Sequence, residues 1–515
     1  MLVSGGTGAD PQTPLGLPGL PPPFLGTAVV GDGGLTAAVD AYGNVVDLRA
    51  GPAGRALIEN PAERQAAGSV AADTGIVPRV VIDEEQLPLW RADSAAQRYL
   101  PGTNVVRTVA WIGRVRVTID DAAAAATLAR TVDVSAPPGV RAEATLGVRV
   151  DPNVRCARSR RPLALVCSLG VGGTTADLAV VQREDGVAAE ARRIIAAAAK
   201  GDRGWIARAR PLAPRAPGWA RGLYRRSLLI LRALSDRGGG IAAGARDGWA
   251  YVWPRDAGTV ALALTSAGYR PEARRVARFL LDLDLGGGAR FEGDGTPAAG
   301  REAQGDASGW VAVAARAAHL PPPHRPLPWR ERADYQERTP GTYLANAIAA
   351  TAAPVDGRQT RLYGGRSAHQ REAAGIERAF GGPAGLVRRA GDPGSGLDSA
   401  AAWAVRPFPV PGLFPAARRS LLGLAAEQTP FGITPAEDWP GTDPWTAPTA
   451  WTAWSLAALG ERRQALRLLG TLWRASTPAG ALPERVDVST GVPVSTTPLA
   501  WPHAFAILAL RQLWP

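Results

Sequence analysis

The chain of 515 residues has almost no lysine, since Lys200 is its only one among 58 basic residues. Lys200 stands before Gly201 without the glycine pattern of a phosphate-binding loop, which excludes a P-loop nucleotide site. A Schiff-base mechanism would have to use this same residue, which lies in an alanine-rich helical pattern. The scarcity of lysine therefore excludes two large classes of enzyme.

Cysteine and histidine are equally scarce. Cys156 and Cys167 are the only cysteines, too few for a cysteine-rich zinc site or a disulfide framework. They flank a short strand pattern, so they either pair across a hairpin or remain two buried free thiols, and we expect free thiols. The four histidines, at positions 319, 324, 369 and 503, have no metal-ligand spacing. No metal site and no cofactor are predicted.

The chain also lacks a run of 18 apolar residues, so no membrane-spanning helix and no membrane partner are predicted. Residues 1–23 have neither a positively charged start nor a continuous apolar stretch, and they are rich in glycine and proline. They are expected to form a disordered leader rather than a signal peptide, which favours a cytoplasmic location. The oligomeric state is not determined by the sequence.

The net charge is +12, and the densest basic stretch runs over residues 192–226, with ten basic residues against Asp202 alone. One interpretation is a surface that follows a phosphate backbone. The other, which we favour, is a solvated linker helix. Because no zinc-finger spacing and no RNA-binding aromatic motif accompany the stretch, no nucleic-acid partner is predicted.

Two patterns follow one another along the chain. Residues 24–185 contain short β-runs with period-two alternation, separated by Gly, Asp, Asn and Pro, as in an antiparallel β-sandwich. The clearest runs begin at residues 27, 79, 104, 114 and 142. Residues 186–217 form a helical linker, and helical periodicity continues over a second domain at 218–515.

The second domain contains about a dozen helical segments, many of them apolar on most faces. The predicted ranges are 219–235, 256–268, 271–284, 306–319, 326–335, 341–353, 368–380, 397–405, 416–427, 444–459, 461–474 and 498–513. Helices that are apolar all round belong in an interior. Their alternation with amphipathic helices predicts two concentric rings, an (α/α)6 toroid. The loops between them are rich in Trp, Asp and Glu, so chemistry is expected there.

The most informative stretch is residues 246–256, which read RDGWAYVWPRD and end at a predicted helix. Trp249, Tyr251 and Trp253 alternate beside the pair Arg255 and Asp256. Such a set suits a sugar, because rings stack on its C–H faces while charged groups take its hydroxyls. The alternative is an aromatic core strand with Asp256 as a helix cap.

Five motifs in order resemble glycoside hydrolase family 15, the glucoamylase-like hydrolases. They cover nearly the whole chain: 30–43 (VGDGGLTAAVDAYG) with 97–108 (QRYLPGTNVVRT), 224–234 (YRRSLLILRAL) with 240–245 (GIAAGA), 249–256, 437–445 (EDWPGTDPW), and 482–487 (LPERVD) with 498–503 (PLAWPH). The first pair resembles the N-terminal β-sandwich of that family. The resemblance implies an inverting enzyme that releases glucose from the non-reducing end of an α-glucoside or α-linked oligosaccharide.

In such an enzyme one carboxylic acid protonates the leaving oxygen and one carboxylate activates water. The resemblance implies that Glu484 is the general base and that Glu337, followed by Arg338, is the general acid. Gln336 stands where the family usually has Trp, and Glu337 with Arg338 could instead be a structural ion pair. An inverting mechanism places the two carboxyl groups roughly 6.5–9.5 Å apart in one pocket.

The remaining predicted substrate contacts follow from the same resemblance. They are Trp249, Tyr251, Trp253, Arg255, Asp256, Asp306, Arg338, Asp438, Trp445 and Trp501. N-capping explains Asp306 equally well. Thr434 stands where relatives often have an Arg, four residues before Asp438, which puts a second-glucose contact in doubt. Two alternatives therefore remain: a trehalase or α-1,6-glucan hydrolase on the same fold, and an inactive carbohydrate-binding relative.

Overall fold

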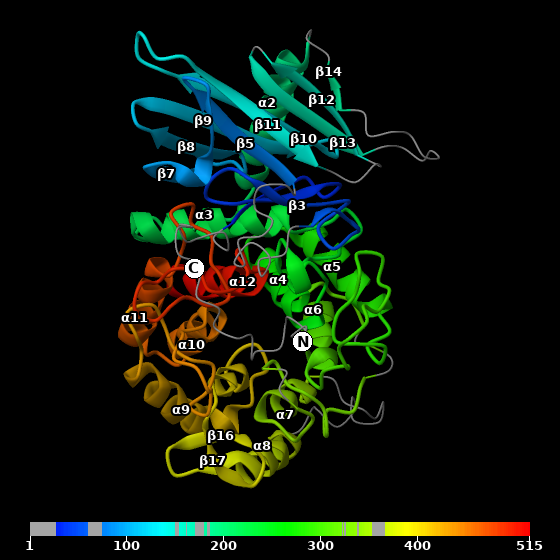
Figure 1. The fold of residues 1–515 in the computed structure, drawn as a ribbon. Helices are drawn as coiled ribbons and strands as arrows, with labels where there is room; N and C mark the ends of the chain where they lie inside the picture. Colours follow the sequence, from blue (N-terminus) through cyan, green and yellow to red (C-terminus); the bar gives the residue numbers. More distant parts are fainter. Residues whose placement is uncertain are drawn as a thin grey trace.

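The computed structural model describes residues 27–59, 75–149, 154–160, 162–169, 180–182, 186–321, 323, 326–336, 339–352 and 366–515. Figure 1 shows a β region (residues 27–182) stacked on a helical region (residues 218–515). The predicted leader, residues 1–23, lies outside the described residues. Over the described ranges, none of the helices has the length and apolar character needed to cross a bilayer.

The described part of the β region forms two seven-stranded sheets. The first contains β1 (Ala28–Gly31), β2 (Thr36–Val39), β3 (Val45–Arg49), β4 (Ala56–Glu59), β5 (Gly75–Ile82), β6 (Glu85–Pro88) and β11 (Ala142–Arg149). The second contains β7 (Ser94–Tyr99), β8 (Val106–Ile112), β9 (Val115–Ala124), β10 (Thr127–Ser135), β12 (Val154–Arg160), β13 (Leu163–Leu169) and β14 (Val180–Gln182). A short 3-10 helix, η1 (Leu89–Arg91), connects β6 to β7.

Alternating side chains bring the two sheets together. In β9, for example, Val115, Val117 and Ile119 are buried while Arg116 between them is exposed. Apolar residues of both sheets join in one core, as period-two strands with one buried face require. Paired strands are antiparallel except β12 and β14, so the prediction of antiparallel sheets in the N-terminal part is confirmed.

The expectation of two free thiols is wrong, because Cys156 and Cys167 form a disulfide. The two cysteines lie directly opposite each other in the antiparallel pair β12–β13, with Cα atoms 4.0 Å apart. This register, set by the hairpin, places the two Cβ atoms within bonding reach. The hairpin interpretation of the pair was the better one.

Helix α2 (Val187–Ile206) follows the β region and packs against β9, β10 and β13. Its buried apolar residues are Val187, Ala191 and Ala199, and the two alanines allow a close approach to the sheet. Arg226, at the end of the basic stretch, lies with its guanidinium 3.8 Å from the Tyr99 ring and bonds to the Thr103 carbonyl. That arginine therefore belongs to the contact between the two regions rather than to a solvated surface.

Among the described residues of the helical region, the α-helices are α3 (Gly218–Ala233), α4 (Pro254–Ser266), α5 (Arg270–Asp282), α6 (Ala307–Ala317), α7 (Leu344–Ala350), α8 (Arg366–Phe380), α9 (Phe414–Ala426), α10 (Thr446–Ala458), α11 (Arg462–Arg474) and α12 (Ala500–Leu513). Three 3-10 helices are η2 (Asp247–Trp249), η4 (Ser399–Ala404) and η5 (Pro411–Leu413). A small sheet contains β15 (Gly381–Gly382), β16 (Gly385–Arg389) and β17 (Asp392–Leu397).

The helix contacts close into a ring. Going round it, α4 contacts α6, α6 contacts α7, α7 contacts η4, η4 contacts α10, α10 contacts α12, and α12 returns to α4 (Figure 1). Helices α10 and α12 are buried on nearly every face, whereas α5 and α11 bury one face only. Helices α3, α5, α8, α9 and α11 each pack against a member of the ring.

One predicted helix is absent, since residues 326–335 contain no helical turn. Glu331 has a φ of 54°, in the left-handed region, and the backbones of Arg332 and Gly341 pair in both directions at 3.2 Å. Two prolines, at 326 and 328, also oppose a helix here, because the residue before a proline avoids the α conformation. The other eleven predicted segments each overlap an α-helix or a 3-10 helix.

Candidate active site

A small pocket lies where three helices of the ring begin. It is lined by Ala243, Trp249, Trp253, Arg255, Asp256, Tyr335, Trp445, Glu484, Leu499 and Trp501. Trp253, Trp445 and Leu499 are the extended residues that precede α4, α10 and α12. Helix N-termini present free N–H groups and a positive dipole end, so this position suits ligands rich in oxygen.

Glu484 is held in the pocket by two side-chain donors. The indole Nε1 of Trp249 donates to Oε1 at 3.3 Å, and the Ser495 hydroxyl donates to Oε2. The Glu484 backbone is fixed as well, because its N–H donates to the Thr496 carbonyl and its carbonyl accepts from the Thr446 N–H, both at 3.0 Å. Hydrogen bonds to the ionised form of a carboxyl group favour that form. The arrangement therefore favours a carboxylate at Glu484.

A buried histidine, His503, anchors the loop that carries Glu484. His503 Nε2 accepts from the Leu482 N–H at 2.9 Å, and its Nδ1 lies 2.9 Å from the Ser227 hydroxyl. Because Nε2 accepts from a backbone N–H, the proton must reside on Nδ1, which donates to Ser227. Burial, together with the charge of Arg226, lowers the pKa of His503 to about 3, so this ring is neutral at ordinary pH.

Arg255 and Asp256 enter the pocket from the first turn of α4. Arg255 Nη1 donates to Gln304 at 2.7 Å and to Asp306 at 3.1 Å, and its Nε lies 3.8 Å from Asp256 Oδ2. Burial raises the pKa of Asp256 to about 7, against the lowering effect of Arg255, and the charges of Glu484 and Asp306 raise it further. Asp256 therefore has a pKa near neutrality and lines the same pocket as Glu484.

Neither aspartate caps its helix. Trp253 is the N-cap of α4, which places Asp256 within the first turn, and the Asp306 side chain makes no capping hydrogen bond at α6. Asp306 bonds to Arg255 instead, so it orients the guanidinium rather than the helix. The contacts with Arg255 therefore explain both residues better than helix capping does.

Indole rings form much of the pocket wall. The Arg255 guanidinium lies 4.6 Å from the centroid of the Trp501 ring. The indole nitrogens of Trp253, Trp445 and Trp501 are buried, and none has a hydrogen-bond partner in the described protein. A buried N–H without an acceptor is costly, and in this pocket a ligand oxygen could serve as the acceptor.

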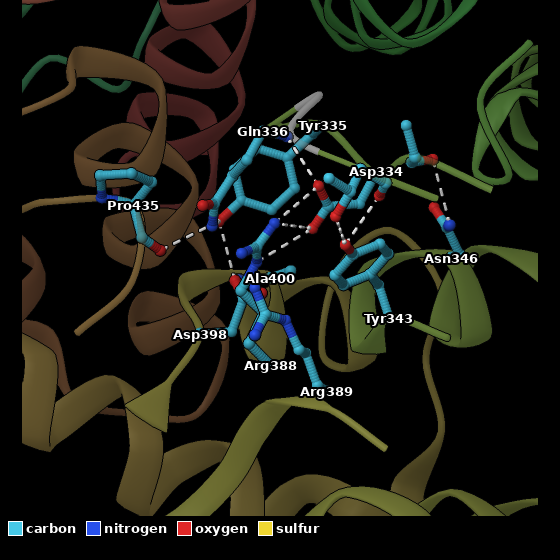
Figure 2. Close-up of polar contacts among 12 residues, drawn as sticks. Asp334, Tyr335, Gln336, Tyr343, Asn346, Arg388, Arg389, Asp398, Ala400 and Pro435 are labelled. Atoms are coloured by element: carbon cyan, nitrogen blue, oxygen red, sulfur yellow. Dashed lines mark hydrogen bonds and ion pairs between the residues drawn. The ribbon is translucent and has the colours of Figure 1, made fainter. Parts of the chain in front are cut away.

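A second polar cluster lies behind Tyr335, and Figure 2 shows how its side chains meet. Arg388, from β16, bonds to Asp334 through Nε and Nη2 at 3.1–3.3 Å and to Asp438 at 3.3 Å. The Tyr335 hydroxyl lies 2.8 Å from Asp398, whose pKa is raised to about 7 by burial and then by Asp334. This cluster connects to the pocket through Tyr335, which is one of the lining residues.

The structure brings most of the predicted site residues to one place. Glu484, Trp249, Trp253, Arg255, Asp256, Trp445 and Trp501 line the pocket, and Asp306 contacts Arg255. Two predicted contacts lie elsewhere: Asp438 is paired with Arg388, and the Tyr251 ring packs under Arg290 at 4.4 Å. Glu337 and Arg338 lie outside the described residues. Within those residues, no group of three or more His, Cys, Asp or Glu has a metal-binding arrangement.

Three residues of the site and its surroundings, Tyr335, Ser495 and Arg388, were not predicted from the sequence. Tyr335 directly precedes Gln336, so its place beside the candidate acid was a usable signal. Ser495 lies eleven residues from Glu484 and meets it only because the chain turns back between them. Arg388 lies 50 residues from Asp438 and 54 from Asp334, and nothing local marks it.

No protein-family model and no curated protein matches the sequence. Among solved structures, a bacterial glucoamylase complexed with acarbose matches 94% of this chain and 93% of its own, with a TM-score of 0.69 and 14% identity. A glycosidase matches 57% of this chain at 20% identity (97% of its own chain, TM-score 0.47). The glycoside hydrolase family 15 glucoamylase from Hypocrea jecorina also matches 57%, at 15% identity (71% of its own chain, TM-score 0.43). The first match shows a shared fold over both regions.

Proposed function

We propose that the protein is a glycoside hydrolase, an exo-acting, inverting enzyme of glucoamylase type that releases glucose from an α-glucoside. The observation that carries this proposal is the pocket itself, where a carboxylate held by two donors lies with a buried Arg–Asp pair among indole rings. The fold shared with a bacterial glucoamylase that binds acarbose supports it. The closed ring of helix contacts likewise supports an (α/α)6 toroid, in which the described residues between α6 and α7 contain no helix at the place of one outer helix.

Glu484 is the proposed general base. Both of its carboxylate oxygens accept a hydrogen bond, so the ionised form that must take a proton from water is the favoured one. Arg255 and Asp256 are proposed to hold the hydroxyls of the terminal sugar, and Trp253, Trp445 and Trp501 to enclose it. A charged pair gives stronger and better oriented hydrogen bonds to hydroxyls than neutral groups do.

Glu337 is the proposed general acid. It follows Gln336, which is buried, and Tyr335, which lines the pocket, so the chain approaches the site immediately before this residue. Inversion requires a water between base and sugar, so the carboxyl groups of Glu337 and Glu484 are expected to lie roughly 6.5–9.5 Å apart. The anomeric configuration of the first product tests this: an α-glucoside should release β-glucose.

A substrate panel tests the proposal as a whole. Purified protein is incubated with maltose, isomaltose, trehalose and soluble starch, and glucose release is followed over time. Hydrolysis of maltose and starch supports the glucoamylase type, whereas hydrolysis of trehalose or isomaltose alone points to the other two linkages. Binding of these sugars without hydrolysis of any would indicate an inactive relative.

The variant Glu484→Gln tests the base directly. It should fold normally and lose about two to four orders of magnitude in kcat, because no other group takes the proton from water. Glu427→Gln, at the exposed end of α9, is the matched control and should keep full activity. Near wild-type turnover in a well-folded Glu484→Gln protein would remove Glu484 from the mechanism.

A further inference from the structure

The buried cluster behind Tyr335 has no role in the proposed chemistry, yet it contacts the pocket. Arg388 and Asp334 have side chains with 0% exposure, and Asp398 is buried beside them. Burying charges costs free energy, and replacing a buried ion pair by apolar residues often leaves a protein equally or more stable. Stability alone therefore does not account for this cluster.

Arg388 fixes the conformation of a short segment, residues 334–336, through hydrogen bonds to Asp334. Its Nε and Nη2 hold both carboxylate oxygens of Asp334, which fixes the orientation of that carboxylate (Figure 2). Asp334 Oδ1 accepts in turn from the Gln336 N–H at 3.0 Å. An aspartate that bonds to the backbone two residues later forms an Asx turn. The guanidinium of Arg388 thus locks the turn at residues 334–336.

That turn sets the position of a pocket wall. Tyr335, its middle residue, lines the pocket, and its ring centroid lies 5.3 Å from that of Trp451 and 6.1 Å from that of Trp501. Its hydroxyl is 2.8 Å from Asp398 and 3.0 Å from the Pro435 carbonyl, and it accepts from Gln336 Nε2 at 3.0 Å. The side chain is therefore fixed by hydrogen bonds at its hydroxyl, and its ring packs edge-to-face with the two indoles.

We propose that Arg388 is a positioning residue for the active site: through Asp334 it fixes the turn that presents Tyr335 to the terminal sugar. It does not touch the sugar, because its side chain has no exposed surface. Its third contact, Nη1 to Asp438 at 3.3 Å, joins the segment around Asp438 to the same anchor. The kinetic consequences of this inference depend on the proposed hydrolase function, whereas its structural consequence does not.

The test compares Arg388→Met and Arg388→Lys with Arg389→Met. Arg389 is the next residue of β16, is half-exposed and pairs only loosely, at 3.9 Å, with Asp392, so it is the matched control. Arg388→Met should lower kcat about 10- to 100-fold and raise KM, because a misplacement near one ångström at a reacting site has effects of this size. Arg388→Lys should recover part of the loss, and Arg389→Met should behave as wild type.

Two further measurements separate positioning from stability. The double variant Asp334→Asn, Arg388→Met removes both charges of this ion pair, so it does not leave Asp334 as an unpaired buried carboxylate and should fold. We expect it to match the wild type in urea unfolding and yet keep the lowered kcat of the single variant. Near-ultraviolet circular dichroism without sugar should also change in both Arg388→Met proteins, since Tyr335 packs on Trp451 and Trp501.

A double variant with wild-type kcat, KM and dichroism would overturn the inference and leave Arg388 a structural residue. If the wild type hydrolyses none of the sugars, the proposed function fails instead. In that case near-ultraviolet circular dichroism still tests the positioning role of Arg388. An unchanged spectrum in the double variant overturns that role, and a changed spectrum supports it.

Discussion

On one side of the pocket, three neutral side chains hold the loop that carries Glu484. His503 accepts from the Leu482 N–H, and Ser495 and Trp249 donate to the Glu484 carboxylate. On the other side, the turn at Tyr335 is held by the ion pair of Arg388 and Asp334 and by Asp398. Both sides are buried, and both fix a pocket residue through a partner distant in sequence. They differ in how they respond to protons.

The stabilising contribution of the first side is lost as the pH falls, and that of the second side is lost as the pH rises. The pKa of His503 is lowered to about 3, so the unfolded chain takes up the proton first and stability falls as the pH drops from about 6.5 toward 3. The pKa of Asp398 is raised to about 7, so its contribution is complete below about 4 and is lost as the pH rises through 7. The combined stabilising contribution of the two sides should therefore be largest at weakly acidic pH.

Among the variants that test this comparison, Asp256→Asn should have the largest effect. Loss of a charged hydrogen bond to the sugar is expected to lower kcat/KM by about 10- to 100-fold. Asp256 has a pKa raised to about 7 by burial, so ionising it costs stability as the pH rises from about 4 through 7. The variant should therefore gain stability over the wild type at pH 8 and lose that advantage at pH 4.

Urea unfolding at both pH values and kinetics on the best sugar measure these effects. Asp282→Asn, at the exposed end of α5, is the matched control. If Asp256→Asn is destabilised at every pH instead, the carboxylate supports the helix and not the sugar.

Ser495→Ala tests the neutral side at the base itself. The Ser495 hydroxyl donates to Glu484 Oε2, so its loss removes one of the two donors that favour the carboxylate. We expect kcat to fall about tenfold near pH 5, and the acidic limb of its pH profile to move to higher pH by about one unit. An unchanged acidic limb would show that Ser495 does not influence the ionisation of the base.

His503→Gln tests the anchor of the loop. Glutamine can replace one of the two hydrogen bonds, so the free energy of unfolding should fall by about 1–3 kcal/mol at pH 7.5 and kcat several-fold. Because the titrating group is gone, the stability of the variant should decline less between pH 6.5 and 4 than that of the wild type. Parallel declines in the two proteins would assign the acid sensitivity to other groups.

Replacing both cysteines by serine should have the smallest effect on activity. Cys156 and Cys167 close a short loop in the second sheet of the β region, and a loop of this length contributes about 2–3 kcal/mol in the chain-entropy account. We expect lower thermal stability with kcat and KM unchanged, since the two cysteines belong to the core of the β region, and Trp253 and Trp501 of the pocket to that of the helical region. A tenfold loss of kcat in the folded variant would show that the far sheet also supports the pocket.

Local patterns were sufficient for much of the architecture. Period-two alternation in runs such as 114–119 predicted strands, and apolar repeats predicted eleven of the twelve helical segments. The exception, residues 326–335, combines helix-forming residues with two prolines and a left-handed Glu331. Its conformation is decided by backbone pairing between Arg332 and Gly341, an interaction that no local propensity encodes.

Within the candidate site, the sequence by itself determined which residue types stand where helices begin, and the motif at 249–256 already placed an Arg–Asp pair among tryptophans. Only the tertiary structure decided the partners: Ser495 on Glu484, His503 under Leu482 and Arg388 on Asp334. The physical reason is range, because capping and periodicity act over a few residues whereas a buried polar group takes whatever partner the packed chain brings to it. The cysteine pair shows the same limit, since a strand pattern predicts a hairpin but only its register sets Cys156 opposite Cys167.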